Sequence, residues 1–178
     1  MSIPMTTLAA EHVAPEERIV RFILCPKNWD AEEEKVKPNF IHLRTKEPGV
    51  SFVRYDFLGG QEATIEKGNE YAEAVNCYKK KKGKPFAAEH LIGWGTCKAQ
   101  EIINLDPKVI SLIVDRPQET PYHVAIQFSL EGGVVRGIVK DAYILELFET
   151  IEDSILKYEL LSDEGKEGSR ALEASRKV

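Results

Sequence analysis

One segment of the chain, residues 122–140, restricts the fold more than any other. Its sequence YHVAIQFSLEGGVVRGIVK holds two runs of β-branched and aromatic residues, separated by Glu131, Gly132 and Gly133. Two such runs joined by a short glycine-containing turn are typical of a β-hairpin. Because a hairpin pairs its strands antiparallel, this segment predicts a sheet that is at least partly antiparallel.

Three further segments have the composition of strands. They are RIVRFILCP over 18–26, VSFVRYDFL over 50–58 and KVISLIVDRP over 108–117. Neither face of 50–58 is purely polar, which predicts an inner strand covered on both sides. Phe52 and Phe57 are expected to anchor that strand in the core. The sequence therefore predicts a mixed, mostly antiparallel sheet.

Two longer helices are predicted from apolar residues spaced by three and four. The first spans 61–83 and contains Gly68 and Asn69, which are expected to break it near its start. The second spans 141–161, where Asp141 is a suitable N-cap and an apolar stripe recurs at helical spacing. That stripe consists of Ile144, Leu147, Phe148, Ile151 and Ile155. Such a stripe indicates a core-facing helix, with a partner groove or a dimer seam as the alternative.

The segment between the two helices contains Trp94 with a glycine on either side. Small residues next to a large ring let another backbone pass close to it, so this pattern predicts packing and not a phosphate-binding loop. Thr96 is expected to cap a short helix from Cys97 to about Leu105.

Length and composition fit one domain. The chain has 178 residues, of which 43% are hydrophobic and 30% charged. We expect an α+β fold with mobile termini: a flexible N-terminal arm over 1–17, a single domain over 18–161, and a disordered or partner-folded tail over 162–178. Neither a signal peptide nor a transmembrane segment is visible, so the protein is expected to be soluble and cytoplasmic. The formal net charge of −5 argues against a general attraction to nucleic acid or membranes.

The three cysteines, Cys25, Cys77 and Cys97, are interpreted as reduced thiols that fill small spaces. Their number is odd and their spacing does not suit zinc, so the sequence predicts no metal and no cofactor. A nucleophilic Cys97 would need a histidine in an electropositive pocket, and His90 is near it only along the chain.

Histidine and arginine side chains are the candidates for a functional site. His42 and Arg44 are two residues apart, so they share one face of an extended segment, and such a pair can bind a phosphate or assist proton transfer. If His123 lies next to them, the three side chains form an anion-binding or phosphoester-cleaving cluster. Arg54 and Arg116 are further candidates for ligand binding.

One known class of enzyme does not fit this cluster. Two-histidine phosphoesterases place Thr or Ser two residues after each histidine, whereas these positions hold Arg44 and Ala125 here. We therefore expect His42 and Arg44 to lie on an exposed approach to the strand, suited to binding an anion or an acidic partner.

A run of four lysines, Lys79, Lys80, Lys81 and Lys82, ends the first predicted helix. A helix C-terminus favours cations, so a solvated helix end explains the run. A local basic patch that contacts phosphate or nucleic acid is the alternative, although no aromatic residues interrupt the lysines.

Three stretches in the order FIHLRTKEPGVSFVRYDFL, GWGTCKAQEI and DRPQETPYHVAIQF resemble a diffuse group of small uncharacterised bacterial proteins. The resemblance covers roughly residues 19–128. It implies a bacterial accessory protein from a defence- or toxin-related locus, and it transfers no catalytic residue.

Two hypotheses about function follow. The first is a non-enzymatic interaction module that recognises another protein, with a homodimer as one form of that interaction. The second is a small enzyme that acts on a phosphate-containing ligand, such as a nucleotide or an RNA end, through His42, Arg44 and His123. The second hypothesis requires these three side chains to meet in one concave pocket.

Overall fold

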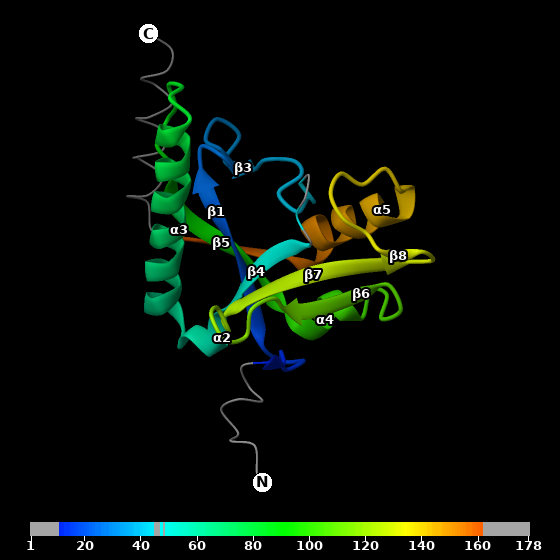
Figure 1. Cartoon of the computed structure of the whole chain (residues 1–178). Coiled ribbons are helices and arrows are strands. Elements are labelled where there is room, and N and C mark those ends of the chain that lie inside the picture. Colours follow the sequence, from blue (N-terminus) through cyan, green and yellow to red (C-terminus); the bar gives the residue numbers. More distant parts are fainter. Residues whose placement is uncertain (1–10, 45–46, 48, 162–178) are drawn as a thin grey trace.

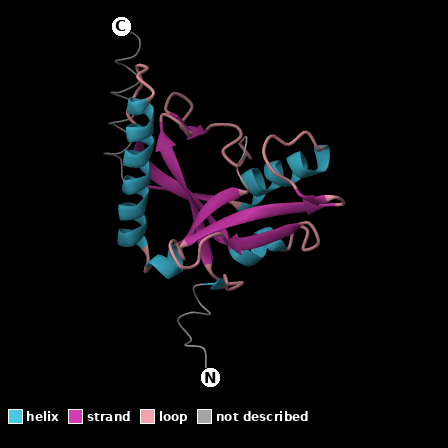
Figure 2. Cartoon of the chain, viewed as in Figure 1, coloured by secondary structure: helices cyan, strands magenta, loops and turns pink. Residues whose placement is uncertain are grey.

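The computed structural model describes residues 11–44, 47 and 49–161, and an antiparallel sheet is its main element (Figures 1 and 2). The strands of this sheet are β1 (Arg18–Cys25), β4 (Val50–Arg54), β5 (His90–Lys98), β6 (Ile110–Val114), β7 (His123–Leu130), β8 (Gly133–Val134) and β9 (Lys157–Leu160). Their order is β6-β7-β4-β1-β5-β9, and β8 pairs with β7. A separate small hairpin joins β2 (Trp29–Asp30) to β3 (Lys35–Val36). The predicted single-domain α+β fold with a mostly antiparallel sheet is confirmed.

The helices pack on this sheet. They are α2 (Tyr55–Leu58), α3 (Gln61–Lys81), α4 (Ala99–Ile103), α5 (Ala142–Thr150) and the π-helical turn η1 (Ile151–Ile155). Among the described residues, no helix is both long enough and apolar enough to cross a lipid bilayer.

The longest strand pairing in the sheet is that of β1 with β5. They are in register from Arg18↔Lys98 to Cys25↔His90, with one irregularity after Ile23. The segment 90–98 was not predicted as a strand, because Gly93 and Gly95 lower its strand propensity. Trp94 in this strand is 2% exposed, so its role is in packing, as its two flanking glycines predicted.

The close backbone passage occurs at Gly93. A Cβ atom at this position would lie 2.2 Å from the carbonyl oxygen of Glu159 in β9, so only a glycine lets β9 approach β5 this closely.

The two faces of the sheet are covered by different helices (Figure 1). One core contains alternate residues of the strands, such as Ile19, Ile23 and Val124, together with the apolar stripe of α5 and η1. The other core contains Val20 and Phe22 of β1 and is packed by α3. Because strand residues alternate between faces, β1 contributes to both cores.

The apolar stripe of the C-terminal helix lies in the core, as predicted. Ile144, Leu147, Phe148 and Ile151 are buried, and Ile155 packs against them. Asp141 caps α5 by accepting hydrogen bonds from the N–H groups of Tyr143 and Ile144.

The long helix α3 contacts the sheet through small residues. Its buried positions are Thr64, Gly68 and Ala72, which are spaced by four and share one face. A Cβ atom on Gly68 would lie 2.6 Å from Leu91 Cδ2, so this glycine permits close packing between α3 and the sheet. The sequence predicted a break in the helix at this position, and that prediction is wrong, because α3 continues through Gly68.

Polar contacts fix the C-terminal half of α3. The Asn76 side chain donates to the carbonyl of Glu89 and accepts from its N–H, at 2.9 and 2.7 Å. The carboxylate of Glu89 is 1% exposed and pairs with Lys79. Lys79 therefore has a structural partner, whereas Lys80, Lys81 and Lys82 are exposed.

Several predicted elements have different limits. The strand expected over 50–58 ends at Arg54, because the chain continues as α2; Phe57 is consequently 39% exposed and does not anchor the core, whereas Phe52 is 1% exposed. Thr96 lies inside β5 and caps no helix. The second half of the expected hairpin is reduced to β8.

The predicted helix over 141–161 also ends early. It changes into η1 and then, after Leu156, into the edge strand β9, which pairs with β5. From Lys157 on, the backbone forms hydrogen bonds with β5 and no longer forms those of a helix. A local sequence pattern does not reveal pairing with a strand that is distant along the chain.

The N-terminal arm expected over 1–17 falls partly outside the described residues. Its last residues are bound to the domain: the N–H of Ala99 donates to the carbonyl of Glu17, and the N–H of Gln100 donates to that of Pro15. The predicted tail over 162–178 lies outside the described residues.

Candidate ligand-binding cavity

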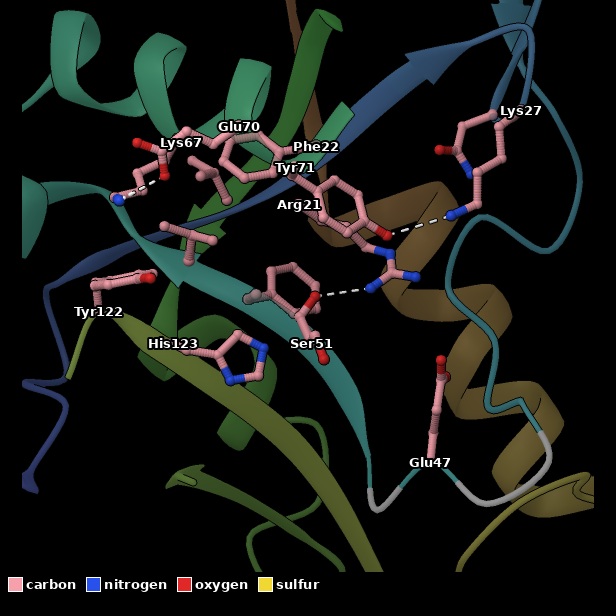
Figure 3. A pocket seen from close by; sticks show the side chains of 14 residues that line it. Arg21, Phe22, Lys27, Glu47, Ser51, Lys67, Glu70, Tyr71, Tyr122 and His123 are labelled. Atoms are coloured by element: carbon pink, nitrogen blue, oxygen red, sulfur yellow. Dashed lines mark hydrogen bonds and ion pairs between the residues drawn. The ribbon is translucent and has the colours of Figure 1, made fainter. Parts of the chain in front are cut away.

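A cavity of about 480 Å³ lies between α3 and the face of β1, β4 and β7 (Figure 3). Its apolar wall includes Val20 and Phe22 of β1 and Val53 of β4. Its polar groups come from distant parts of the chain, and they are Arg21, Lys27, Asn28, Glu47, Ser51, Lys67, Glu70, Tyr71, Tyr122 and His123.

The cavity exists because β1 and β4 separate. These strands are in register only at Ile19↔Arg54 and Val20↔Val53, and beyond this point they diverge (Figure 3). β1 remains paired with β5, and β4 remains paired with β7. A wedge-shaped gap therefore opens in the sheet at the level of Arg21 and Ser51.

Arg21 crosses this gap. Its Nη1 donates to the Ser51 carbonyl at 2.7 Å, and its Nε donates to the Phe40 carbonyl at 3.0 Å. The guanidinium thus binds a carbonyl group of β4 that the backbone of β1 is too far away to pair with. Its carbon Cζ also lies 5.4 Å from the centre of the Phe40 ring.

Arg21 forms no ion pair within the described chain, although the carboxylates of Glu47 and Glu152 are near enough to act on its charge. No carboxylate of residues 11–44, 47 and 49–161 forms an ion pair with it, and its Nη2 has no hydrogen-bond partner among them. Burial lowers the pKa of Arg21, and electrostatic interactions with Tyr71, Glu47 and Glu152 oppose that effect. Arginine stays protonated in proteins, so a half-buried cation faces the cavity.

Lys27 and Tyr71 border the cavity beside Arg21. The Lys27 ammonium donates to the Tyr71 hydroxyl at 3.2 Å and lies 5.4 Å from the centre of its ring. The backbone N–H of Lys27 donates to Glu89 at 2.9 Å, which fixes the turn that carries this side chain. Two cations therefore lie at the same end of the cavity.

The other end contains an internally paired lysine. Lys67 contacts Glu70 at 2.6 Å and lies 5.2 Å from the centre of the Tyr122 ring. The hydrogen bond to Glu70 is the main reason why the pKa of Lys67 is raised.

His123 lies on the β7 side of the cavity and is half-buried. Burial lowers the pKa of His123; the charge of Asp115 acts in the opposite direction, and those of Arg116 and Arg21 lower it further. The imidazole is therefore neutral near pH 7, and in that form one ring nitrogen donates and the other accepts.

The cavity holds one of the three residues predicted to form a cluster. His123 lines it, whereas His42 and Arg44 do not. The His42 ring packs 6.3 Å from that of Phe148 in α5. Arg44 is exposed, as expected, and its charge reaches Arg21 closely enough to lower the pKa of that guanidinium.

The other two predicted ligand-binding arginines also lie outside the cavity lining. Arg54 is 2% exposed and binds the Glu17 carboxylate through Nε at 2.7 Å and through Nη2 at 3.0 Å. Its Nη1 donates to the carbonyl of Pro121 at 2.9 Å. Arg54 thus connects the N-terminal segment, β4 and the turn before β7. Arg116 is exposed and pairs with Glu119 at 3.2 Å.

The cysteines and acidic residues form no other centre. Cys25 and Cys97 are buried and Cys77 is exposed, and none of the three forms a disulfide bond. Burial raises the pKa of Cys97 to about 12, which keeps its thiol protonated and unsuited to nucleophilic attack. Among the residues with described positions, no group of His, Cys, Asp and Glu side chains is suited to hold a metal ion.

Arg21, Lys27 and Tyr71 were not predicted as site residues. Arg21 interrupts the apolar run of 18–25, and a charge inside such a strand was a signal that could have identified it. Lys27 and Tyr71 gave no such signal, because their meeting depends on how α3 lies over the turn after β1.

Comparisons with protein families, with curated proteins and with solved structures found no match to this chain.

Proposed function

We propose that this protein binds a phosphate-containing anion in the cavity between α3 and the sheet. The observation that carries the proposal is Arg21, a half-buried guanidinium that faces the cavity without a carboxylate partner in the described chain. A buried charge is stable only when it is paired or hydrogen-bonded, and an anionic ligand would supply the missing partner.

The distribution of charge supports this proposal. The cavity is lined by three cationic side chains, Arg21, Lys27 and Lys67, and by two carboxylates, Glu47 and Glu70. The whole chain has a formal charge of −5, so this excess of positive charge is local. A local positive potential in a partly enclosed site favours anions over the general surface of the protein.

The proposal is for binding and not for catalysis. Phosphoester cleavage by the predicted cluster would need His42 and His123 in one pocket, and His42 instead packs against Phe148. The expected cytoplasmic location remains part of the proposal and is supported by the absence of disulfide bonds among the three cysteines, which suits a reducing compartment.

Calorimetric titration with inorganic phosphate and with pyrophosphate tests this function. We expect saturable binding of at least one of these anions and about a tenfold loss of affinity in Lys27→Met, because one charged hydrogen bond contributes about 1.5 kcal/mol or more. Lys81→Met is the matched control, because Lys81 is exposed near the end of α3 and lies outside the cavity lining. An absence of binding, or equal losses in both variants, would contradict the proposal.

Binding of another protein is a second candidate function. Four exposed apolar side chains come from β8, α5 and the loop between them: Val134, Ile138, Tyr143 and Leu145, with Ile138 64% exposed. Exposed apolar groups mark interaction surfaces where they form one patch, and these four belong to consecutive segments of the chain. Light scattering with size-exclusion chromatography should detect a homodimer that Ile138→Glu dissociates. A monomer at all concentrations would exclude self-association as the form of this interaction.

A further inference from the structure

The cavity is larger than a bare phosphate requires. Its volume of about 480 Å³ falls in the range of about 300–1,000 Å³ that is typical of sites for organic ligands. The two cations at one end, Arg21 and Lys27, would occupy only the charged part of such a ligand. The remaining lining residues therefore determine what the rest of the ligand is.

The middle of the cavity is apolar and aromatic. Val20, Phe22 and Val53 form part of its wall, and they belong to the core under α3. Tyr71 reaches over the cavity from α3, and Tyr122 lies at the other end beside Lys67 (Figure 3). Tyr71 is 42% exposed, and the centre of its ring lies 6.1 Å from that of Phe22 in the cavity wall. Such a lining favours a flat, unsaturated group over a flexible aliphatic chain.

His123 adds a neutral polar contact. Its imidazole has no hydrogen-bond partner in the described part of the chain, and it is uncharged near pH 7 for the reasons given above. One ring nitrogen can donate and the other can accept. A side chain with one donor and one acceptor suits the edge of a heterocycle, which presents hydrogen-bond donors and acceptors but no charge.

We propose that the anion is a phosphomonoester that carries an aromatic heterocycle, as in a mononucleotide. Its phosphate binds Arg21 and Lys27, its ring lies against the tyrosines, and the edge of its ring meets His123. This inference rests on the proposed function, because it assigns the phosphate to the same cations.

Four probes separate the two proposals: inorganic phosphate, glycerol 3-phosphate, adenosine 5′-monophosphate and adenosine. We expect the nucleotide to bind at least tenfold more tightly than glycerol 3-phosphate, and adenosine to bind more weakly than the nucleotide. Equal affinities for the nucleotide and glycerol 3-phosphate would overturn this inference and leave the anion site intact. If none of the phosphates binds, the proposed function fails as well.

Variants of Tyr71 test the role of the ring. Tyr71→Leu should reduce the nucleotide affinity to that of glycerol 3-phosphate without changing the affinity for inorganic phosphate. Tyr71→Phe keeps the ring and loses only the hydrogen bond from Lys27, so it should keep the preference for the nucleotide. Tyr78→Leu is the matched control, since Tyr78 is 61% exposed on the same helix and lies outside the cavity lining. A preference that survives in Tyr71→Leu would contradict the ring contact.

Discussion

Two arginines on neighbouring strands have opposite electrostatic surroundings. Arg54 in β4 is fully buried and is neutralised by the Glu17 carboxylate. Arg21 in β1 is half-buried and binds only carbonyl oxygens within the described chain. The first arrangement is complete without a ligand, whereas the second leaves a positive charge at the cavity. Charge type alone therefore does not identify a binding residue, and the partner of each charge must be known.

The Arg54–Glu17 pair makes the N-terminal segment part of the domain. We expect Glu17→Ala to lower the free energy of unfolding by about 3–5 kcal/mol, because it leaves a buried guanidinium without its carboxylate. Urea denaturation measures this change.

The preceding residue provides a control for this variant. Glu16 forms an ion pair with Lys98 in which both side chains are largely exposed, so Glu16→Ala should leave the unfolding midpoint unchanged. If both variants had the same small effect, the Arg54–Glu17 pair would not stabilise the domain.

His123 makes the stability of the domain depend on pH. Because burial lowers its pKa, the unfolded chain takes up a proton more readily than the folded chain. The free energy of unfolding should therefore decrease as the pH falls below about 6.5, the usual value for histidine, and this contribution should vanish above it. Urea titrations at a series of pH values should give a flatter profile for His123→Gln than for the natural chain. Identical profiles would show that another group causes the dependence.

At the scale of elements, the pairing of β5 with β9 depends on one glycine. The Cβ atom of Gly93→Ala would meet the backbone of Glu159, which cannot move without breaking the strand pair. We expect a loss of about 1–3 kcal/mol in unfolding free energy, in the range of overpacked cores.

Gly95→Ala on the same strand is the matched control. Its Cβ atom would lie 3.3 Å from the side chains of Leu156, Phe40 and Tyr158, which are able to shift. Thermal unfolding should rank Gly93→Ala clearly below Gly95→Ala, and the reverse order would contradict the close passage of β9.

Elements with local signals were predictable, and those that depend on pairing were not. Asp141 and the stripe from Ile144 to Ile151 identified a helix, because a cap and a repeat of three and four are properties of one segment. The change to β9 after Leu156 depends on the free edge of β5, which lies far away in sequence. The strand β5 itself was missed, because its glycines oppose a strand locally while β1 and β9 pair with it on both sides.

The candidate site was less predictable than the fold. His123 was identified because it follows a turn at the start of a strand, but its expected neighbours His42 and Arg44 lie elsewhere. Arg21 acts in the cavity only because β1 and β4 diverge, and no local pattern reports that divergence.

At the scale of the whole molecule, the sheet should be most stable where its strands pair over the greatest length. The inner strands β7, β4, β1 and β5 have partners on both sides, and β1 and β5 share the longest pairing, whereas β6 and β9 are edges of the sheet. Hydrogen exchange should therefore be slowest in β1 and β5 and faster in β6 and β9, because edge strands open at lower cost. Mass spectrometry of peptides from these strands measures the order. Equal protection would indicate that the sheet opens only as one unit.

The gap between β1 and β4 has a consequence for how such a protein changes over generations. The space between these strands is set by backbone pairing with β5 and β7 and not by the removal of side-chain volume from a core. Lining residues such as Lys27 and Tyr71 can therefore be replaced while both cores keep their packing. A family with this architecture would acquire new ligand preferences through few substitutions and at little risk to folding.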